Sequence, residues 1–148
     1  MLLLLFEAGN ERFGLDAADV IEVTPLLACR ALPHAPPYVS GLTSYRGASV
    51  PVIDLSALLT GQPAPSLLST RLVLVRYGSR VLALRAARAI ETLRCSDGDF
   101  QQAPVRIDSA PYLGPLIVDA GGRMIQKVDV ATLLSPAVRD GLFSPENG

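Results

Sequence analysis

The chain has 148 residues, of which 49% are apolar and 18% are charged, and its formal net charge is −1. This length suits one domain with a real core, or two small lobes that share a core. The near-neutral charge argues against bulk binding to nucleic acid or to an anionic membrane. No apolar run approaches the roughly 18 residues of a helical membrane crossing. The apolar run at 2–6 lacks a basic leader, so we expect no signal peptide and a cytoplasmic protein.

An internal duplication organises the chain. Residues 3–22 align without a gap to residues 72–91, and residues 47–59 align to 122–134. The two matches are collinear, which makes a chance alignment of aliphatic segments less frequent. Each copy predicts a strand, a turn at a glycine, a second strand and then one or two helical turns.

The repeated units predict an all-β fold with short helices. The expected strands are rich in β-branched residues and are bounded by Gly, Ser or Pro. We therefore expect one domain over 1–148 with two similar lobes, built mainly from about 1–65 and 66–148, with exchange of strands between them allowed. Closing each lobe into a small barrel would remove its exposed strand edges.

Asp54 and Asp129 occupy equivalent places in the two copies, each at the end of an expected strand. A carboxylate at that position can cap the following helix by accepting backbone N–H bonds. Two duplicated aspartates also suggest an aspartic-protease dyad. However, Asp-Leu-Ser and Asp-Val-Ala lack the Asp-Thr/Ser-Gly turn of such enzymes, so we interpret both residues as structural caps.

The remaining reactive residue types form no catalytic or metal-binding pattern. His34 is the only histidine, which excludes a site with several histidine ligands, and no Gly-x-Ser-x-Gly elbow occurs. Cys29 and Cys95 are expected to be buried, unpaired thiols. The sequence therefore predicts no enzyme, no cofactor and no metal.

The segment GLTSYRGASVPVIDL at 41–55 resembles the GxxNLRGxxxPVxDL segment of the CheW-like family. The resemblance covers nearly the whole chain. FGLD at 13–16 matches the family's second strand, and VIEV at 20–23 is similar to its V-x-E-I. YLGPLI at 112–117 is similar to a later YLxGLG-like stretch, and the last strand begins with GRMI at 122–125.

This resemblance implies two five-stranded, SH3-like barrel lobes around a shared apolar core. It also implies a non-catalytic adaptor in two-component signal transduction. The adaptor would couple the cytoplasmic tip of a methyl-accepting chemotaxis-type receptor to the regulatory domain of a CheA-type histidine kinase. Self-association into rings, lobe one against lobe two, is a further implication. The partner-binding residues carried over from the motif are Val20, Glu22, Gly41, Arg46 and Gly47.

Two departures from the family pattern favour a variant coupler of an alternative chemosensory pathway. Ser44-Tyr45 replaces the usual Asn-Leu before Arg46, and Gln126-Lys127 is polar where the family strand is apolar. Arg46 presents a planar fork that suits a carboxylate, and Glu22 is its expected partner because family members pair the matching residues. A plain solvent-facing arginine is the alternative interpretation of Arg46.

Six arginines lie between positions 71 and 94, against Glu91 alone. A solvated face explains them, but a nucleic-acid-binding β-barrel is an alternative function. Only Tyr77 is aromatic in that stretch, so the base-stacking part of such a surface is nearly missing.

Equivalent positions of the two copies carry opposite charge. Asp16 and Asp19 in the first copy correspond to Arg85 and Arg88 in the second. We hypothesise that this inversion favours head-to-tail packing, with lobe one of one molecule against lobe two of the next.

Overall fold

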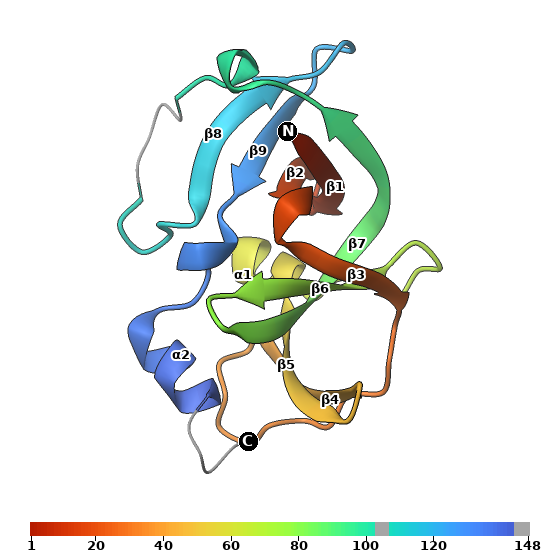
Figure 1. Ribbon diagram of the computed structural model, residues 1–148, viewed down its shortest axis with the longest axis vertical. Helices are drawn as coiled ribbons and strands as arrows, with labels where there is room; N and C mark the ends of the chain where they lie inside the picture. Colours follow the sequence, from red (N-terminus) through yellow and green to blue (C-terminus); the bar gives the residue numbers. More distant parts are fainter. Residues whose placement is uncertain (103–106, 144–148) are drawn as a thin grey trace.

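The computed structural model describes residues 1–102 and 107–143. Strands are its main regular structure and the helices are short, which confirms the all-β class (Figure 1). The elements in chain order are β1 (Leu2–Ala8), β2 (Glu11–Asp16), η1 (Ala17–Asp19), β3 (Val20–Pro25), β4 (Val39–Tyr45), β5 (Ala48–Asp54), α1 (Leu55–Thr60), β6 (Arg71–Tyr77), β7 (Arg80–Arg94), η2 (Asp97–Asp99), β8 (Leu113–Val118), β9 (Met124–Val128), η3 (Val130–Thr132) and α2 (Pro136–Leu142).

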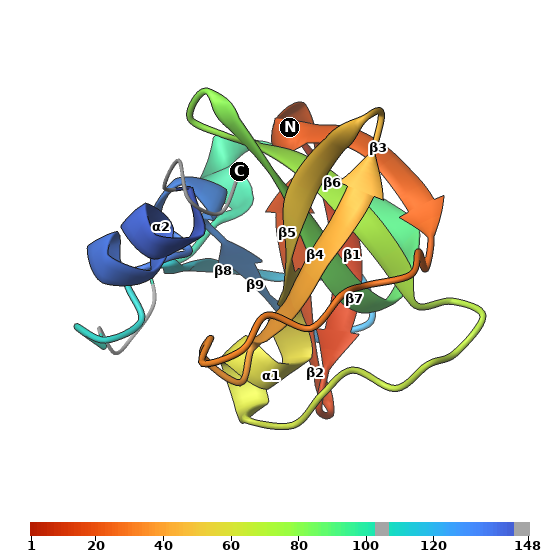
Figure 2. The ribbon, with the colours of Figure 1, turned by 90° about the horizontal axis from the view of Figure 1, so that it is seen from below.

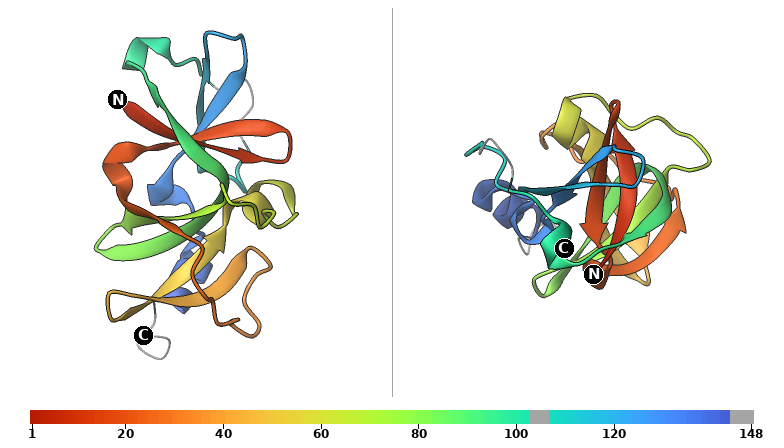
Figure 3. Two further views of the ribbon diagram at one scale, coloured as in Figure 1. Left: turned by 90° about the vertical axis from the view of Figure 1, so that its right-hand side faces the viewer. Right: turned by 90° about the horizontal axis from the view of Figure 1, so that it is seen from above.

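The strands form two five-stranded sheets that share β7. Sheet A has the order β7-β1-β2-β9-β8, and sheet B has the order β3-β6-β7-β5-β4. β7 pairs with β6 up to Ala86 and with β1 from Ala87 onward, so one strand runs from sheet B into sheet A (Figure 3, left). Strands from both halves of the chain therefore enter sheet A, and residue 65 does not separate the sheets.

The expected closed barrels are not formed. Among the described residues, no ladder joins β3 to β4 in sheet B or β8 to β7 in sheet A. Single bridges cover part of the open edges instead: Arg30 pairs with Leu42 on β4, and Gln101 pairs with Leu116 on β8. The loops that precede β4 and β8 thus satisfy edge groups that closure would have paired.

Strand pairing confirms the duplication. β2 lies parallel to β9 with Gly14 opposite Lys127, and β7 lies parallel to β5 with Ala83 opposite Val52. These two pairs occupy equivalent positions of the repeat, so the copies share their register.

The expected helical turn at the end of the repeat forms only in the first copy. There η1 leads β2 of sheet A into β3 of sheet B. In the second copy the backbone stays extended through β7, with a bulge against β1 and a positive φ of 53° at Arg88. The chain thus passes between the sheets through a 3₁₀ turn in the first copy and through a bulged strand at the equivalent place in the second copy.

Apolar side chains on both faces of β1 and β6 are buried, which explains the high apolar content of the chain. Phe6 on β1 and Val73 on β6 enter the core shared by both sheets. The alternate positions face two smaller clusters: Leu3 and Leu5 pack with Ile125 in sheet A, and Leu72 and Leu74 pack with Val50 in sheet B. The expected shared core is confirmed. Both cysteines are free, but Cys29 is exposed, contrary to the prediction.

Candidate partner-binding surface

The hairpin between β4 and β5 turns at Arg46 and Gly47, beside β3 (Figure 2). Its two-residue loop has φ values of 50° at Arg46 and 79° at Gly47. Positive φ at both positions is typical of a type I′ turn, which matches the twist of the flanking strands. The turn projects Arg46 into solvent, where its side chain is 71% exposed.

Glu22 on β3, Tyr45 on β4 and Arg46 come together at this turn. The Tyr45 hydroxyl donates a hydrogen bond to Glu22 Oε2, and Arg46 Nη2 lies 3.4 Å from the same oxygen. The Arg46 guanidinium carbon lies 5.2 Å from the centroid of the Tyr45 ring. Because β3 and β4 share no ladder, these side chains connect the two open edges of sheet B.

The surroundings of Tyr45 raise the pKa of its phenol. Its hydrogen bond to the Glu22 carboxylate raises the pKa of Tyr45, with a smaller contribution from desolvation. The positive charge of Arg46 acts in the opposite direction. Sequence reasoning identified position 45 as a departure from the motif but did not predict this contact.

Gly41 lies on β4 and Val20 on β3, the two strands that carry this surface. Gly41 is buried at a bulge of β4 with φ +139°, and a Cβ added there would lie 2.0 Å from the carbonyl oxygen of Arg30. Val20 is half-buried and packs against the shared core. This geometry indicates a structural role for Gly41 rather than direct contact with a partner.

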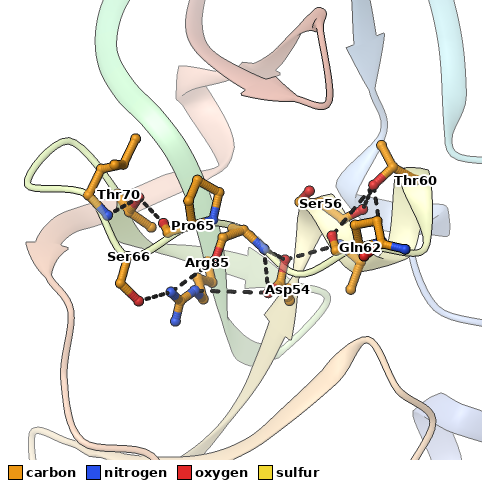
Figure 4. Close-up of polar contacts among 11 residues, drawn as sticks. Asp54, Ser56, Thr60, Gln62, Pro65, Ser66, Thr70 and Arg85 are labelled. Carbon is orange, nitrogen blue, oxygen red and sulfur yellow. Dashed lines mark hydrogen bonds and ion pairs between the residues drawn. The ribbon is translucent and has the colours of Figure 1, made fainter.

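Asp54 holds a polar cluster at the start of α1 rather than a reactive site (Figure 4). Its carboxylate is buried and accepts the Ala57 N–H at 3.1 Å, as predicted for a helix cap, and also the Ala64 N–H. Arg85 lies 3.9 Å away and donates to Ala64 O at 3.1 Å and to Ser66 Oγ at 2.8 Å. This network fixes the loop from 61 to 70 against sheet B.

The residues expected to support assembly lie at the two crossings between the sheets. Asp16 caps η1, and Asp19 lies within it. Burial raises the pKa of the Asp19 carboxyl, and the negative charge of Asp16 raises it further. Arg88 is exposed and pairs with Glu7 at 3.1 Å, whereas Arg85 is mostly covered by its internal network.

Four of the six arginines of 71–94 make separate contacts with residues that are distant in the chain. Arg76 donates to the Ala18 carbonyl at 3.1 Å, Arg80 lies over the Phe143 ring, and Arg85 and Arg88 take part in ion pairs. No observation supports the nucleic-acid alternative. Within the described ranges there is no cluster of metal-binding side chains and no helix long and apolar enough to span a membrane.

Comparison with known proteins matches the CheW-like domain to residues 2–138. The chain belongs to the CheW-like family. It is 28% identical to the chemotaxis protein CheW of Rhizobium meliloti (strain 1021) over 139 residues, which cover 93% of this chain and 90% of that protein. It is also 28% identical to protein FrzA of Myxococcus xanthus over 134 residues, covering 89% of this chain and 84% of FrzA.

A solved structure agrees with the CheW-like fold. The crystal structure of the scaffolding protein TtCheW from Thermoanaerobacter tengcongensis matches 93% of this chain and 89% of its own, with a TM-score of 0.82 at 22% identity. Family membership places this CheW-like chain among non-catalytic scaffold adaptors, which confirms the prediction that it is not an enzyme.

Proposed function

We propose that this protein is a cytoplasmic adaptor that couples the signalling tip of a chemotaxis-type receptor to the regulatory domain of a CheA-type histidine kinase. The main support for this proposal is the β4–β5 turn, which exposes Arg46 to solvent in a chain that matches the CheW-like domain. The names of the relatives, a chemotaxis protein CheW and protein FrzA, support this class of pathway. The departures at Ser44-Tyr45 and Gln126-Lys127 support a variant member.

The proposed partner surface comprises Val20, Glu22, Gly41, Arg46 and Gly47. Arg46 makes the direct contact, because its fork is exposed and a guanidinium pairs well with carboxylates. Gly47 allows the turn, and Gly41 allows the close approach of β4 to Arg30. Glu22 and Val20 shape the adjoining strand.

Self-association is a second part of this proposal. Asp16 and Asp19 lie where the chain passes from β2 of sheet A to β3 of sheet B. Arg85 and Arg88 lie at the equivalent place in the second copy, where β7 passes from sheet B to sheet A. Opposite charges at equivalent places favour head-to-tail packing over like-with-like packing. Among the two arginines, Arg88 is the more exposed and is the stronger candidate for an intermolecular contact.

Binding of a receptor-tip peptide and of an isolated kinase regulatory domain tests the proposal. Replacing an arginine that anchors an interface costs more than about 1 kcal/mol, so we expect Arg46→Ala to weaken binding by about five-fold or more. Arg94→Ala is the matched control, since Arg94 is an exposed arginine at the far end of β7 in sheet A. Equal affinities for wild type and Arg46→Ala, or no binding of either probe by the wild type, would contradict the proposal.

A further inference from the structure

Two donors share one carboxylate oxygen at the β3–β4 seam. The Tyr45 hydroxyl makes the shorter contact with Glu22 Oε2, and Arg46 Nη2 reaches the same atom only at 3.4 Å. That distance lies beyond the usual range of an N–H···O bond. An arginine normally binds a carboxylate through two parallel N–H bonds. Glu22 therefore engages Tyr45 closely and Arg46 weakly.

The ring of Tyr45 has a separate effect on Arg46. It is half-buried and packs against the sheet B cluster that contains Val50 and Leu74, so the core fixes its position. The guanidinium lies over this ring at a distance compatible with a cation–π contact. The ring thus supports the side chain of Arg46 without using its N–H donors.

We infer that Tyr45 is a positioning residue of the partner surface, whose hydroxyl holds the Glu22 carboxylate and leaves the Arg46 guanidinium available to a carboxylate of the partner. The inference rests on the proposed function and names the chemistry of its contact. Without the hydroxyl, the Glu22 carboxylate would turn toward Arg46. A partner's acidic side chain would then have to displace a closer Arg46–Glu22 ion pair than the 3.4 Å contact that exists beside the hydroxyl.

Tyr45→Phe is the decisive change, because it removes the hydroxyl and keeps the ring. The probes are the isolated kinase regulatory domain and a receptor-tip peptide. Exposed ion pairs are weak, so we expect Tyr45→Phe to lower affinity by about two- to five-fold. Adding Glu22→Gln removes the competing carboxylate, so the double variant should bind as tightly as Glu22→Gln alone. Glu22→Gln is therefore the reference for the double variant, because Glu22 itself belongs to the proposed partner surface.

A second measurement needs no partner. The Tyr45 phenol can be titrated by NMR of Cζ-labelled tyrosine, with Tyr45→Phe identifying the signal. Its pKa is raised by the hydrogen bond to Glu22, so Glu22→Gln should lower the pKa toward the ordinary tyrosine value. Tyr112, a buried tyrosine, serves as an internal control whose pKa should not change.

The outcomes separate this inference from the proposed function. Loss of affinity in Tyr45→Phe and its rescue by Glu22→Gln support the inference, since a general folding defect would not be rescued. Unchanged affinity in Tyr45→Phe, or equal weakness of the double variant, would overturn it. If the wild type binds neither probe, the proposed function and the partner half of the inference fail. An unchanged Tyr45 pKa in Glu22→Gln would overturn the contact itself.

Discussion

At the scale of single residues, the backbone geometry of the β4–β5 hairpin decides which side chains are presented. A type I′ turn needs positive φ at both central positions, and only one of them is glycine. Arg46 therefore occupies a conformation that is uncommon for a side-chain-bearing residue. Such a position is consistent with a role for the arginine itself, because glycine or asparagine would form this turn more readily.

Replacing Gly41 or Gly47 by alanine should lower the free energy of unfolding by clearly different amounts. Gly41→Ala should lower the free energy of unfolding by about 2 kcal/mol or more, because the new Cβ would collide with the Arg30 carbonyl. Gly47→Ala meets no atom within 4 Å and should cost only about 1 kcal/mol, from its positive φ. Urea unfolding measures both values. A Gly41→Ala protein as stable as Gly47→Ala would contradict the close approach.

At the scale of elements, equivalent strand-to-helix junctions have diverged. The carboxylates of Asp54 and Asp129 both accept a backbone N–H at the start of the next element. The backbone N–H of each aspartate in turn donates to a tyrosine carbonyl, that of Tyr38 for Asp54 and that of Tyr112 for Asp129. Only Asp54 is buried and paired with an arginine. The position that matches Arg85 in the first copy is Asp16, so the junction in sheet A lacks the equivalent pair.

The two caps should therefore contribute differently to stability. Asp54→Ala leaves the Arg85 guanidinium and the Ala64 N–H without their carboxylate, and should cost about 3 kcal/mol. Asp129→Ala removes an exposed cap and should cost about 1 kcal/mol. The midpoints of urea denaturation compare the two variants. Equal losses would show that the network around Asp54 adds nothing to ordinary capping.

At the scale of the whole molecule, two crossings tie the sheets into one body. β7 passes from sheet B to sheet A, and the β2–η1–β3 segment passes the other way (Figure 3, left). The charged groups at these crossings are acidic in one copy and basic in the other. This arrangement gives each molecule two oppositely charged sites that could meet in a head-to-tail chain.

A charge exchange between two copies tests that packing. Asp19→Arg and Arg88→Asp should each weaken self-association by about two- to five-fold, because like charges would then meet. An equimolar mixture of the two variants should recover part of the lost association. Sedimentation velocity measures the effect, and Glu11→Arg, at the other end of β2, is the control. If the mixture associates no better than the single variants, the proposed contact is wrong.

The sequence by itself determined the all-β class, the duplication, the two aspartate caps and the motif around Arg46. These depend on local patterns: strand periodicity, turn glycines and short-range capping, all of which neighbouring residues specify. Tertiary structure alone decided three other features. The sheets exchange strands and stay open, Arg85 is drawn into an internal network, and Tyr45 reaches Glu22 across the β3–β4 seam. All three features depend on how segments that are distant in the chain lie relative to one another. That arrangement is set by how β3, β5 and β7 cross.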